Sequence, residues 1–132
     1  MNLQEFCRRA IGVPFLEDGR DYDGWDCWGL VMCAYRDVLG MTLPNYTFGS
    51  VKHLARQFRD RKSPLWQPCD QHPMAIACIY RRGSTIHAGL MVGKGRILHV
   101  EQGIETCVER VANMRVEGCY VPAGSRTASV QD

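Results

Sequence analysis

The sequence has no long apolar run and no strong excess of one charge. None of its apolar stretches approaches the ~20 residues that a membrane-spanning helix needs. The 16 basic and 14 acidic side chains are interspersed and leave a net charge of +2, which indicates neither a nucleic-acid surface nor a polybasic membrane patch. Residues 1–10 are charged and amphipathic and lack the apolar segment of a secretory signal. We therefore expect a protein that is made in the cytoplasm and that binds neither nucleic acid nor membrane.

The sequence also lacks any Cys-x-x-Cys pair, although it holds seven cysteines. An odd number cannot pair completely, and without an export signal a disulfide framework is not expected. Four histidines accompany the cysteines, but the close ligand spacings of structural zinc sites are missing. We therefore expect no metal and no cofactor. We interpret the thiols as small buried hydrophobic groups, with Cys27 as the exception.

The 132 residues suit one domain with its own core. Apolar residues recur at helical spacing in the first half of the chain. They predict helices over residues 3–10, over residues 27–39 before a stop at Gly40, and over residues 51–58 after a cap at Ser50. The first half is therefore expected to be helical.

The sequence pattern of the second half of the chain predicts β-strands. Short apolar runs predict strands over residues 74–80, 86–92, 96–101, 106–111 and 116–121. Residues 12–25 are rich in Gly and Asp and are expected to form a loop, and residues 123–132 a disordered tail. Helices followed by strands indicate an α+β fold, with the helices packed on an antiparallel sheet.

One cysteine and two histidines stand where a thiol nucleophile needs its partners. Cys27 begins the second predicted helix, His87 lies on a predicted strand, and His99 follows twelve residues later on the next strand. A thiol nucleophile needs a base and a group that orients that base. The N–H groups at a helix start favour negative charge, so we expect a lowered pKa for Cys27. The same N–H groups are suited to hold an oxyanion.

The predicted hairpin allows a geometric test. With a three-residue turn over residues 93–95, whose last glycine supplies the left-handed conformation, His99 falls opposite Gly89 and Glu101 opposite His87. The two imidazoles then lie diagonally, with backbones about 7–8 Å apart, and Gly89 leaves space beneath them. A two-residue turn would instead turn His99 to the other face.

Several of these interpretations compete with plainer ones. An isolated cysteine in an apolar helix is usually a core residue, but the flanking motif and both histidines favour a nucleophile. Glu101 lies directly across from His87 and competes with His99 as the orienting group; the twelve-residue spacing favours His99 by about two to one. His53 and His72 lie outside the pattern and are interpreted as surface residues.

Together, these motifs resemble those of the NlpC-type cysteine peptidases, in particular the short form found in tail-tip modules of bacteriophages and prophages. The matching blocks are Gly12-Val13-Pro14-Phe15 with Asp26-Cys27-Trp28-Gly29-Leu30-Val31, Leu43-Pro44, His87 through His99, and Glu117-Gly118-Cys119-Tyr120. The cysteine and histidine blocks are specific as a pair, whereas either alone is a weak signal. The likeness covers roughly residues 1–122, which we expect to form a single NlpC-type domain.

The resemblance implies a papain-like fold and hydrolysis of amide bonds in peptidoglycan stem peptides, typically between γ-D-glutamate and a diamino acid. By position it implies that Cys27 is the nucleophile, His87 the general base and acid, and His99 the residue that orients His87. Asp26 falls where family members recognise the free amino end of the stem peptide. The resemblance also implies phage tail proteins as partners and a place in a virion tail that acts at the cell wall.

Two positions depart from the family pattern. Trp28 stands where many members have Ser, although Trp is common there in the phage-type branch. Phe15 stands where many have Tyr and cannot donate a hydrogen bond, so Tyr22 or backbone groups would have to substitute. We therefore predict a set of substrate-binding residues around the nucleophile: Asp26, Trp28, Trp25, Tyr22 and Gly89. Two alternative functions stay open, a catalytically silent structural tail-assembly module of the same fold and, more distantly, a zinc-binding domain.

Overall fold

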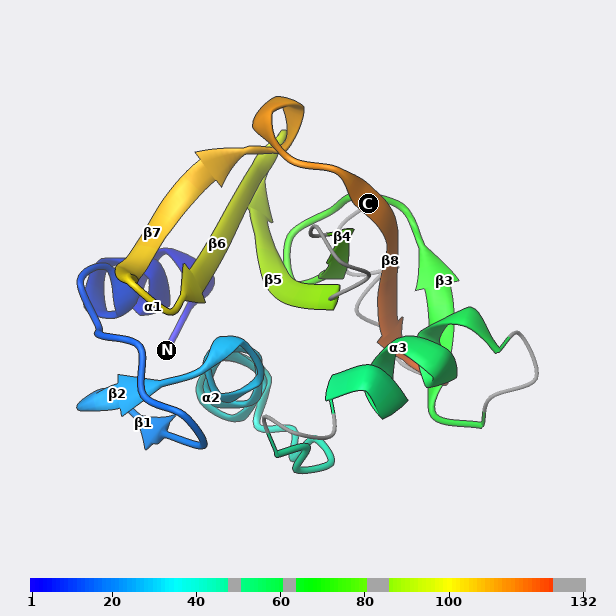
Figure 1. The fold of residues 1–132 in the computed structure, drawn as a ribbon, viewed down its shortest axis with the longest axis horizontal. Helices are drawn as coiled ribbons and strands as arrows, with labels where there is room; N and C mark the ends of the chain where they lie inside the picture. The colour runs from blue at the N-terminus through cyan, green and yellow to red at the C-terminus, as the bar shows by residue number, and fades with distance from the viewer. Residues whose placement is uncertain (48–50, 61–63, 81–85, 125–132) are drawn as a thin grey trace.

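The computed structural model describes residues 1–47, 51–60, 64–80 and 86–124, and it shows helices followed by a curved sheet (Figure 1). The elements are α1 (Leu3–Ala10), β1 (Arg20–Asp21), β2 (Gly24–Trp25), α2 (Cys27–Leu39), α3 (Val51–Arg59), β3 (Trp66–Cys69), β4 (Ile76–Tyr80), β5 (Ile86–Gly93), β6 (Arg96–Glu101), β7 (Ile104–Arg110), the short 3₁₀ helix η3 (Val111–Asn113) and β8 (Val116–Pro122). In the described part of the chain, no helix is long and apolar enough to cross a membrane.

The helix ends follow local capping chemistry. The Asn2 side chain accepts a hydrogen bond from the Glu5 N–H and caps α1, and Asp26 caps α2 in the same way. Gly40 ends α2 in the left-handed conformation, with φ of 65°, which glycine adopts without a steric penalty. The predicted start and stop of α2 are therefore confirmed.

The strands of the larger sheet lie in the order β3-β8-β4-β5-β6-β7, and every neighbouring pair is antiparallel. The sheet arches over α2, and among the strands of this sheet α2 packs chiefly against β5 and β6 (Figure 1). Leu30 and Ala34 of α2 share one buried cluster with Leu90 of β5 and Leu98 of β6. Burial of these side chains joins the helical half of the chain to the sheet, as the predicted α+β class requires.

Three details differ from the expectations. Residues 20–21 and 24–25 form a small two-stranded ribbon inside the predicted loop. Strand β3 was not predicted; it contains Pro68 and lies at the sheet edge, where a proline is tolerated. Strand β4 begins at Ile76 rather than at residue 74, because Met74 adopts a positive φ of 76°.

Two predictions lie partly outside the described residues. Leu54 and Phe58 of α3 are buried as expected, whereas the cap at Ser50 and the position of the His53 side chain are not described. Residues 125–132 of the predicted tail are likewise not described. Ala123 is ordered, since its N–H donates to the Leu65 carbonyl at 2.8 Å.

Candidate active site

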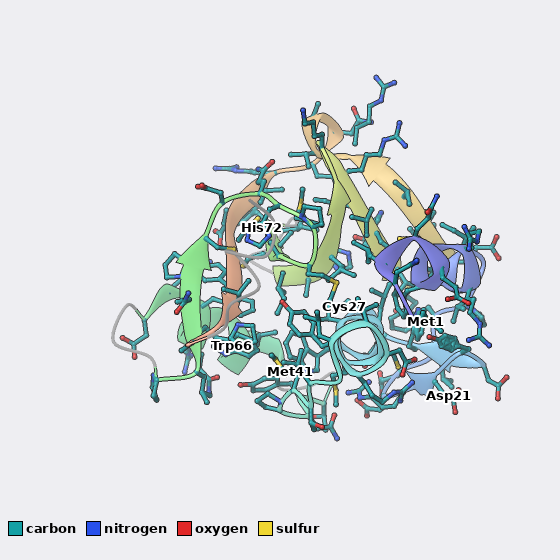
Figure 2. All side chains as sticks on the ribbon, turned by 180° about the vertical axis from the view of Figure 1, so that it is seen from behind. Met1, Asp21, Cys27, Met41, Trp66 and His72 are labelled. Carbon is teal, nitrogen blue, oxygen red and sulfur yellow. The ribbon has the colours of Figure 1, made fainter. Side chains whose placement is uncertain are left out.

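The start of α2 places Cys27 against strand β5 (Figure 2). Asp26 fixes this start, because its Oδ1 accepts the Gly29 N–H at 2.8 Å. The backbone N–H groups of Ala88 and Trp28 face the Cys27 thiol and act to lower its pKa. Ala88 directly follows His87, so the thiol sits beside the strand position that carries the predicted base.

The predicted lowering of the Cys27 pKa is wrong for the protein without substrate. Burial raises the pKa of this thiol to about 11, and the negative charge of Asp26 acts in the same direction. The N–H groups of Ala88 and Trp28 and the charge of Arg20 lower it only in part. The side chain is 7% exposed, and loss of water around a thiolate outweighs the helix terminus. At neutral pH Cys27 is therefore a thiol that needs a base.

The two predicted histidines are in hydrogen-bond contact. His87 Nε2 lies 3.1 Å from His99 Nδ1, and the ring planes meet at 72°. Both side chains are buried, so water competes little for this contact. His87, next to Ala88 in the strand that faces Cys27, is thus held by His99 of the neighbouring strand.

The predicted register of the hairpin is confirmed, since Leu90 pairs with Leu98 and Met91 with Ile97. The turn itself is shorter than predicted. Gly93 pairs with residue 96, and an irregularity between Met91 and Gly93 supplies the extra residue. Gly95 has the expected positive φ of 64°.

Glu101 approaches the same nitrogen as His99 but from farther away. Its Oε1 lies 3.5 Å from His87 Nε2, compared with 3.1 Å for His99 Nδ1. The shorter contact is the one expected of the orienting residue, and the role of His99 stays a prediction.

Two residues of β7 extend this pair, and sequence reasoning missed both. His99 Nε2 lies 3.2 Å from Glu109 Oε1 and 3.8 Å from Cys107 Sγ. These two residues could have been found only if the pairing of β6 with β7 had been predicted, because His99 is then the cross-strand partner of Cys107.

The position of Glu109 favours one tautomer of His99 and, through it, one tautomer of His87. A carboxylate only accepts hydrogen bonds, so it favours the neutral His99 tautomer with hydrogen on Nε2. His99 Nδ1 then accepts from His87 Nε2–H. This places the lone pair of His87 on Nδ1, the nitrogen that can take a proton.

Asp26 is buried and already accepts three hydrogen bonds. Besides the Gly29 N–H, its oxygens accept from Arg20 Nη1 at 2.8 Å and from the Asp18 N–H at 2.9 Å. Its contribution in this structure is to hold the start of α2. The predicted recognition of a substrate amino group stays a prediction.

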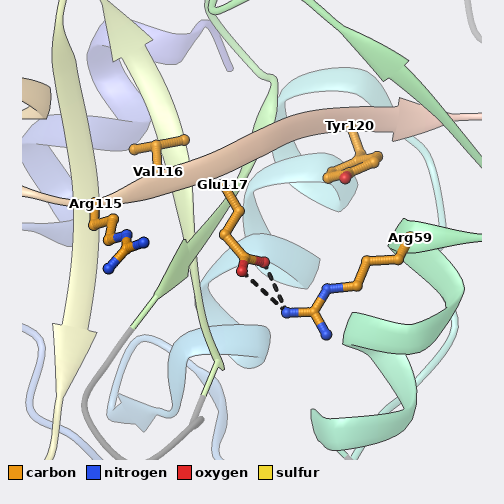
Figure 3. A pocket seen from close by; sticks show the side chains of 5 residues that line it. All are labelled: Arg59, Arg115, Val116, Glu117 and Tyr120. Atoms are coloured by element: carbon orange, nitrogen blue, oxygen red, sulfur yellow. Dashed lines mark hydrogen bonds and ion pairs between the residues drawn. The ribbon is translucent and has the colours of Figure 1, made fainter.

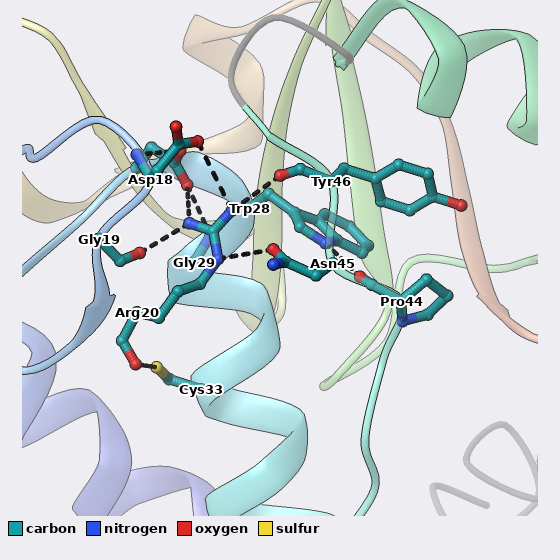
Figure 4. A network of polar contacts seen from close by, with 10 residues as sticks. Asp18, Gly19, Arg20, Trp28, Gly29, Cys33, Pro44, Asn45 and Tyr46 are labelled. Carbon is teal, nitrogen blue, oxygen red and sulfur yellow. Dashed lines mark hydrogen bonds and ion pairs between the residues drawn. The ribbon is translucent and has the colours of Figure 1, made fainter.

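Arg20 is a third residue that sequence reasoning missed. Its guanidinium donates to Asn45 Oδ1, to the Gly19 carbonyl and to the Tyr46 carbonyl, at 3.0, 2.7 and 2.7 Å (Figure 4). With Asp26 it joins the loop, the helix start and residues 45–46. The planar fork of Arg suits several simultaneous acceptors.

Trp25 and Trp28 do not line a groove. Both are 0% exposed, and their indole N–H groups donate to Thr106 Oγ1 and to the Pro44 carbonyl, at 2.8 and 2.7 Å. The prediction that they bind substrate is replaced by a packing role around the start of α2, which large aromatic groups serve well.

Tyr22 and Gly89 also serve the fold rather than a groove. The Tyr22 hydroxyl donates to Asp37 Oδ2 at 2.7 Å, and Asp37 lies about 15 Å along α2 from Cys27. Tyr22 therefore does not replace the missing tyrosine. A Cβ at Gly89 would lie 2.6 Å from Ile97 Cγ2, so Ile97 fills the space predicted beneath the imidazoles.

A surface hollow of about 400 Å³ lies elsewhere, where Arg59 of α3 faces β8 (Figure 3). Arg59 Nη2 and Glu117 Oε2 form an ion pair of 2.9 Å there. The lining residues are Arg59, Arg115, Val116, Glu117 and Tyr120. None of the predicted site residues lines this hollow.

Comparisons with known proteins agree with this architecture. The model of the NlpC/P60 family matches residues 12–121. The crystal structure of the NlpC/p60 domain of peptidoglycan hydrolase SagA superposes with a TM-score of 0.63 at 17% identity, over 90% of this chain and 95% of that one. NlpC2 from Trichomonas vaginalis gives 0.65 at 16% identity, over 90% of this chain and 46% of its own length. No curated protein matches. The predicted papain-like α+β fold is thereby confirmed.

Proposed function

This chain belongs to the NlpC/P60 family, and we propose that it is a cysteine peptidase that hydrolyses amide bonds in peptidoglycan stem peptides. The observation that carries the proposal is that Cys27 lies at the start of α2 beside the backbone N–H of Ala88, the residue after His87, and that His87 Nε2 lies 3.1 Å from His99 Nδ1. The name of one structural neighbour, a peptidoglycan hydrolase, supports the substrate class.

The reaction follows from the protons of the site. As the Cys27 sulfur attacks the amide carbon, His87 Nδ1 takes the thiol proton, and His99 stabilises the resulting imidazolium. The N–H groups at the start of α2 stabilise the negative charge on the carbonyl oxygen. His87 then donates its proton to the leaving amine. Water attacks the thioester with His87 as base, which releases the acid and restores the thiol.

The raised pKa of Cys27 decides when the first proton moves. With a pKa of about 11, the thiolate is a minor species at neutral pH. Proton transfer to His87 therefore accompanies the attack on the substrate rather than preceding it. The burial that keeps the thiol neutral also excludes water from the attacking sulfur.

We propose further that the bond cleaved joins γ-D-glutamate to a diamino acid and that Asp26 contacts the free amino end of the peptide. The motif Asp26-Cys27-Trp28-Gly29 supports membership of the phage and prophage branch. On this proposal the protein is made in the bacterial cytoplasm, joins other tail proteins in a virion tail and acts at the cell wall.

One observation favours a second function, a structural tail module without catalysis. Cys27 and His99 are 7% and 1% exposed, so substrate reaches the site only if the surrounding side chains move. Against this alternative stands the complete set of nucleophile, base and orienting group, which a purely structural module has no chemical reason to keep.

The decisive test is peptide release from purified peptidoglycan of several wall types, followed by mass spectrometry. Cys27→Ala should abolish release while the circular dichroism spectrum is unchanged, and Cys7→Ala, a half-buried thiol on α1, should not. Release that survives Cys27→Ala rules out the mechanism. A folded protein that releases nothing from any wall type supports the structural module.

A further inference from the structure

Three potential metal ligands meet on β6 and β7, and the proposed reaction uses only one of them. His99 and Cys107 are cross-strand partners, and Glu109 lies two residues farther along β7 on the same face. His99 Nε2 lies 3.8 Å from Cys107 Sγ and 3.2 Å from Glu109 Oε1, and the three ligand atoms all lie within 4.8 Å of one another.

These separations match those around a tetrahedral zinc ion. Bond lengths of about 2.0–2.1 Å to histidine, 2.3 Å to cysteine and 2.0–2.2 Å to a carboxylate place neighbouring ligand atoms about 3.4–3.6 Å apart. The observed distances of 3.8 and 3.2 Å fall on either side of this range. The third separation, between Cys107 and Glu109, is at most 4.8 Å, so rotations of these two side chains that close it by at most about 1.2 Å would form the site.

A metal site needs ligands that are held in place and a path from solvent, and the surroundings of His99 provide both. His99 is buried, and its other nitrogen is held by His87, which is the outer hydrogen bond that metal-ligating histidines commonly make. Cys107 and Glu109 are partly exposed, so an ion can enter from solvent, and a water molecule can complete the coordination.

The local charge also favours a cation. The carboxylates of Glu109, Glu101 and Glu105 place negative charge around the Cys107 thiol. The same negative charges attract a divalent ion, which displaces the thiol proton. With one thiolate, one carboxylate and a neutral imidazole, a Zn²⁺ complex carries no net charge.

We propose that His99, Cys107 and Glu109 bind Zn²⁺, and that zinc at this site switches off the peptidase centre. Metal binding is independent of the proposed activity, whereas the inhibition rests on it. The ion takes the lone pair of His99 Nε2, so the hydrogen of the neutral ring moves to Nδ1. That hydrogen is donated to His87 Nε2, which leaves the hydrogen of neutral His87 on Nδ1. His87 then has no lone pair on Nδ1 to accept the Cys27 proton.

The first part of the proposal, Zn²⁺ binding, is tested on the full chain after a chelator has removed any bound metal. Zn²⁺ is then added, and its affinity is measured by competition with a chromophoric chelator. Co²⁺ serves as a second probe, because a cobalt–thiolate bond gives a charge-transfer absorption. We expect one ion per chain. Removing a ligand in Cys107→Ser or Glu109→Gln should weaken binding at least about tenfold.

Matched variants separate this site from the other thiols and carboxylates. Cys27→Ala and Cys7→Ser should leave zinc affinity unchanged, and Glu17→Gln, at an exposed carboxylate in the loop, should do the same. Absence of binding would overturn the proposal. So would binding that Cys27→Ala abolishes and Cys107→Ser retains, because the ion would then lie on the catalytic thiol.

The inhibitory half compares peptide release with and without Zn²⁺, each variant being normalised to its own zinc-free rate. We expect zinc to suppress release by the unmodified chain and to suppress it much less in Cys107→Ser. Equal suppression in both would overturn the switch. If the chain releases no peptide at all, the proposed function fails, while the binding measurements still decide the metal site.

Discussion

Removal of the Asp26 carboxylate tests whether this residue serves the fold or the substrate. In Asp26→Ala the cap of α2 is lost, which costs about 1–2 kcal/mol. The Arg20 guanidinium loses a charge-assisted hydrogen bond of 2.8 Å, and the Asp18 N–H loses its acceptor; each of these adds about 1–2 kcal/mol. We expect the free energy of unfolding to fall by about 3–5 kcal/mol and Tm to fall by about 10–20 °C.

The assay is urea and thermal unfolding followed by circular dichroism. Asp26→Asn keeps one oxygen for the Gly29 N–H, but it loses the charge facing Arg20 and, because its NH2 group replaces Oδ2, the acceptor for the Asp18 N–H. It should therefore cost about 2–3 kcal/mol, less than Asp26→Ala. Asp23→Ala, at an exposed aspartate in the same loop, is the matched control and should change stability by less than about 0.5 kcal/mol. A cost below about 1 kcal/mol for Asp26→Ala would refute the structural role.

The same variants address substrate recognition. If Asp26 binds a free amino group, Asp26→Asn should raise KM for a stem peptide with a free amino end more than for the same peptide with that end acetylated. Equal effects on both peptides would leave only the structural role.

Three further predictions follow from the site. Because the pKa of Cys27 is about 11, its alkylation by iodoacetamide in the folded protein should accelerate roughly tenfold per pH unit between about pH 7 and 10; peptide mapping by mass spectrometry measures it. His87→Ala should be as damaging to kcat/KM as Cys27→Ala, His99→Ala severe but partial, and Glu101→Gln mild. Gly29→Ala should destabilise by about 3 kcal/mol or more, because a Cβ there would lie 2.1 Å from the Gly19 carbonyl oxygen; urea unfolding measures it.

Each of these predictions has an outcome that contradicts it. An alkylation rate that levels off below about pH 9 would indicate a preformed thiolate. A larger loss from Glu101→Gln than from His99→Ala would reverse the assignment of the orienting residue. Gly93→Ala is the control for Gly29→Ala, since a Cβ at Gly93 meets nothing within 4 Å, and equal costs for both would refute the packing argument.

The features that the sequence predicted well depend on neighbours in the chain. The start of α2 follows from the capping carboxylate of Asp26, and its end follows from the left-handed conformation of Gly40. The register that brings His87 and His99 together was predicted from strand alternation and from the positive φ of Gly95, although the extra residue lies in an irregularity between Met91 and Gly93 and not in the turn. Capping, alternation and turn geometry act over a few residues, so they can be read from a short segment.

The tertiary structure decided what the same residues do. Trp25, Trp28 and Tyr22 lie near the nucleophile in sequence, yet packing buries the two indoles and directs the tyrosine to Asp37. Burial likewise reversed the expected shift of the Cys27 pKa.

The cluster of His99, Cys107 and Glu109 likewise could not be predicted from the sequence. Its members come from two strands, and only the pairing of β6 with β7 brings their ligand atoms together. Burial and cross-strand contact depend on which distant segments pack together. No local pattern specifies this, so the chain by itself indicated a candidate nucleophile, a candidate base and the fold class, while the packing of distant segments decided the burial and the neighbours of these residues.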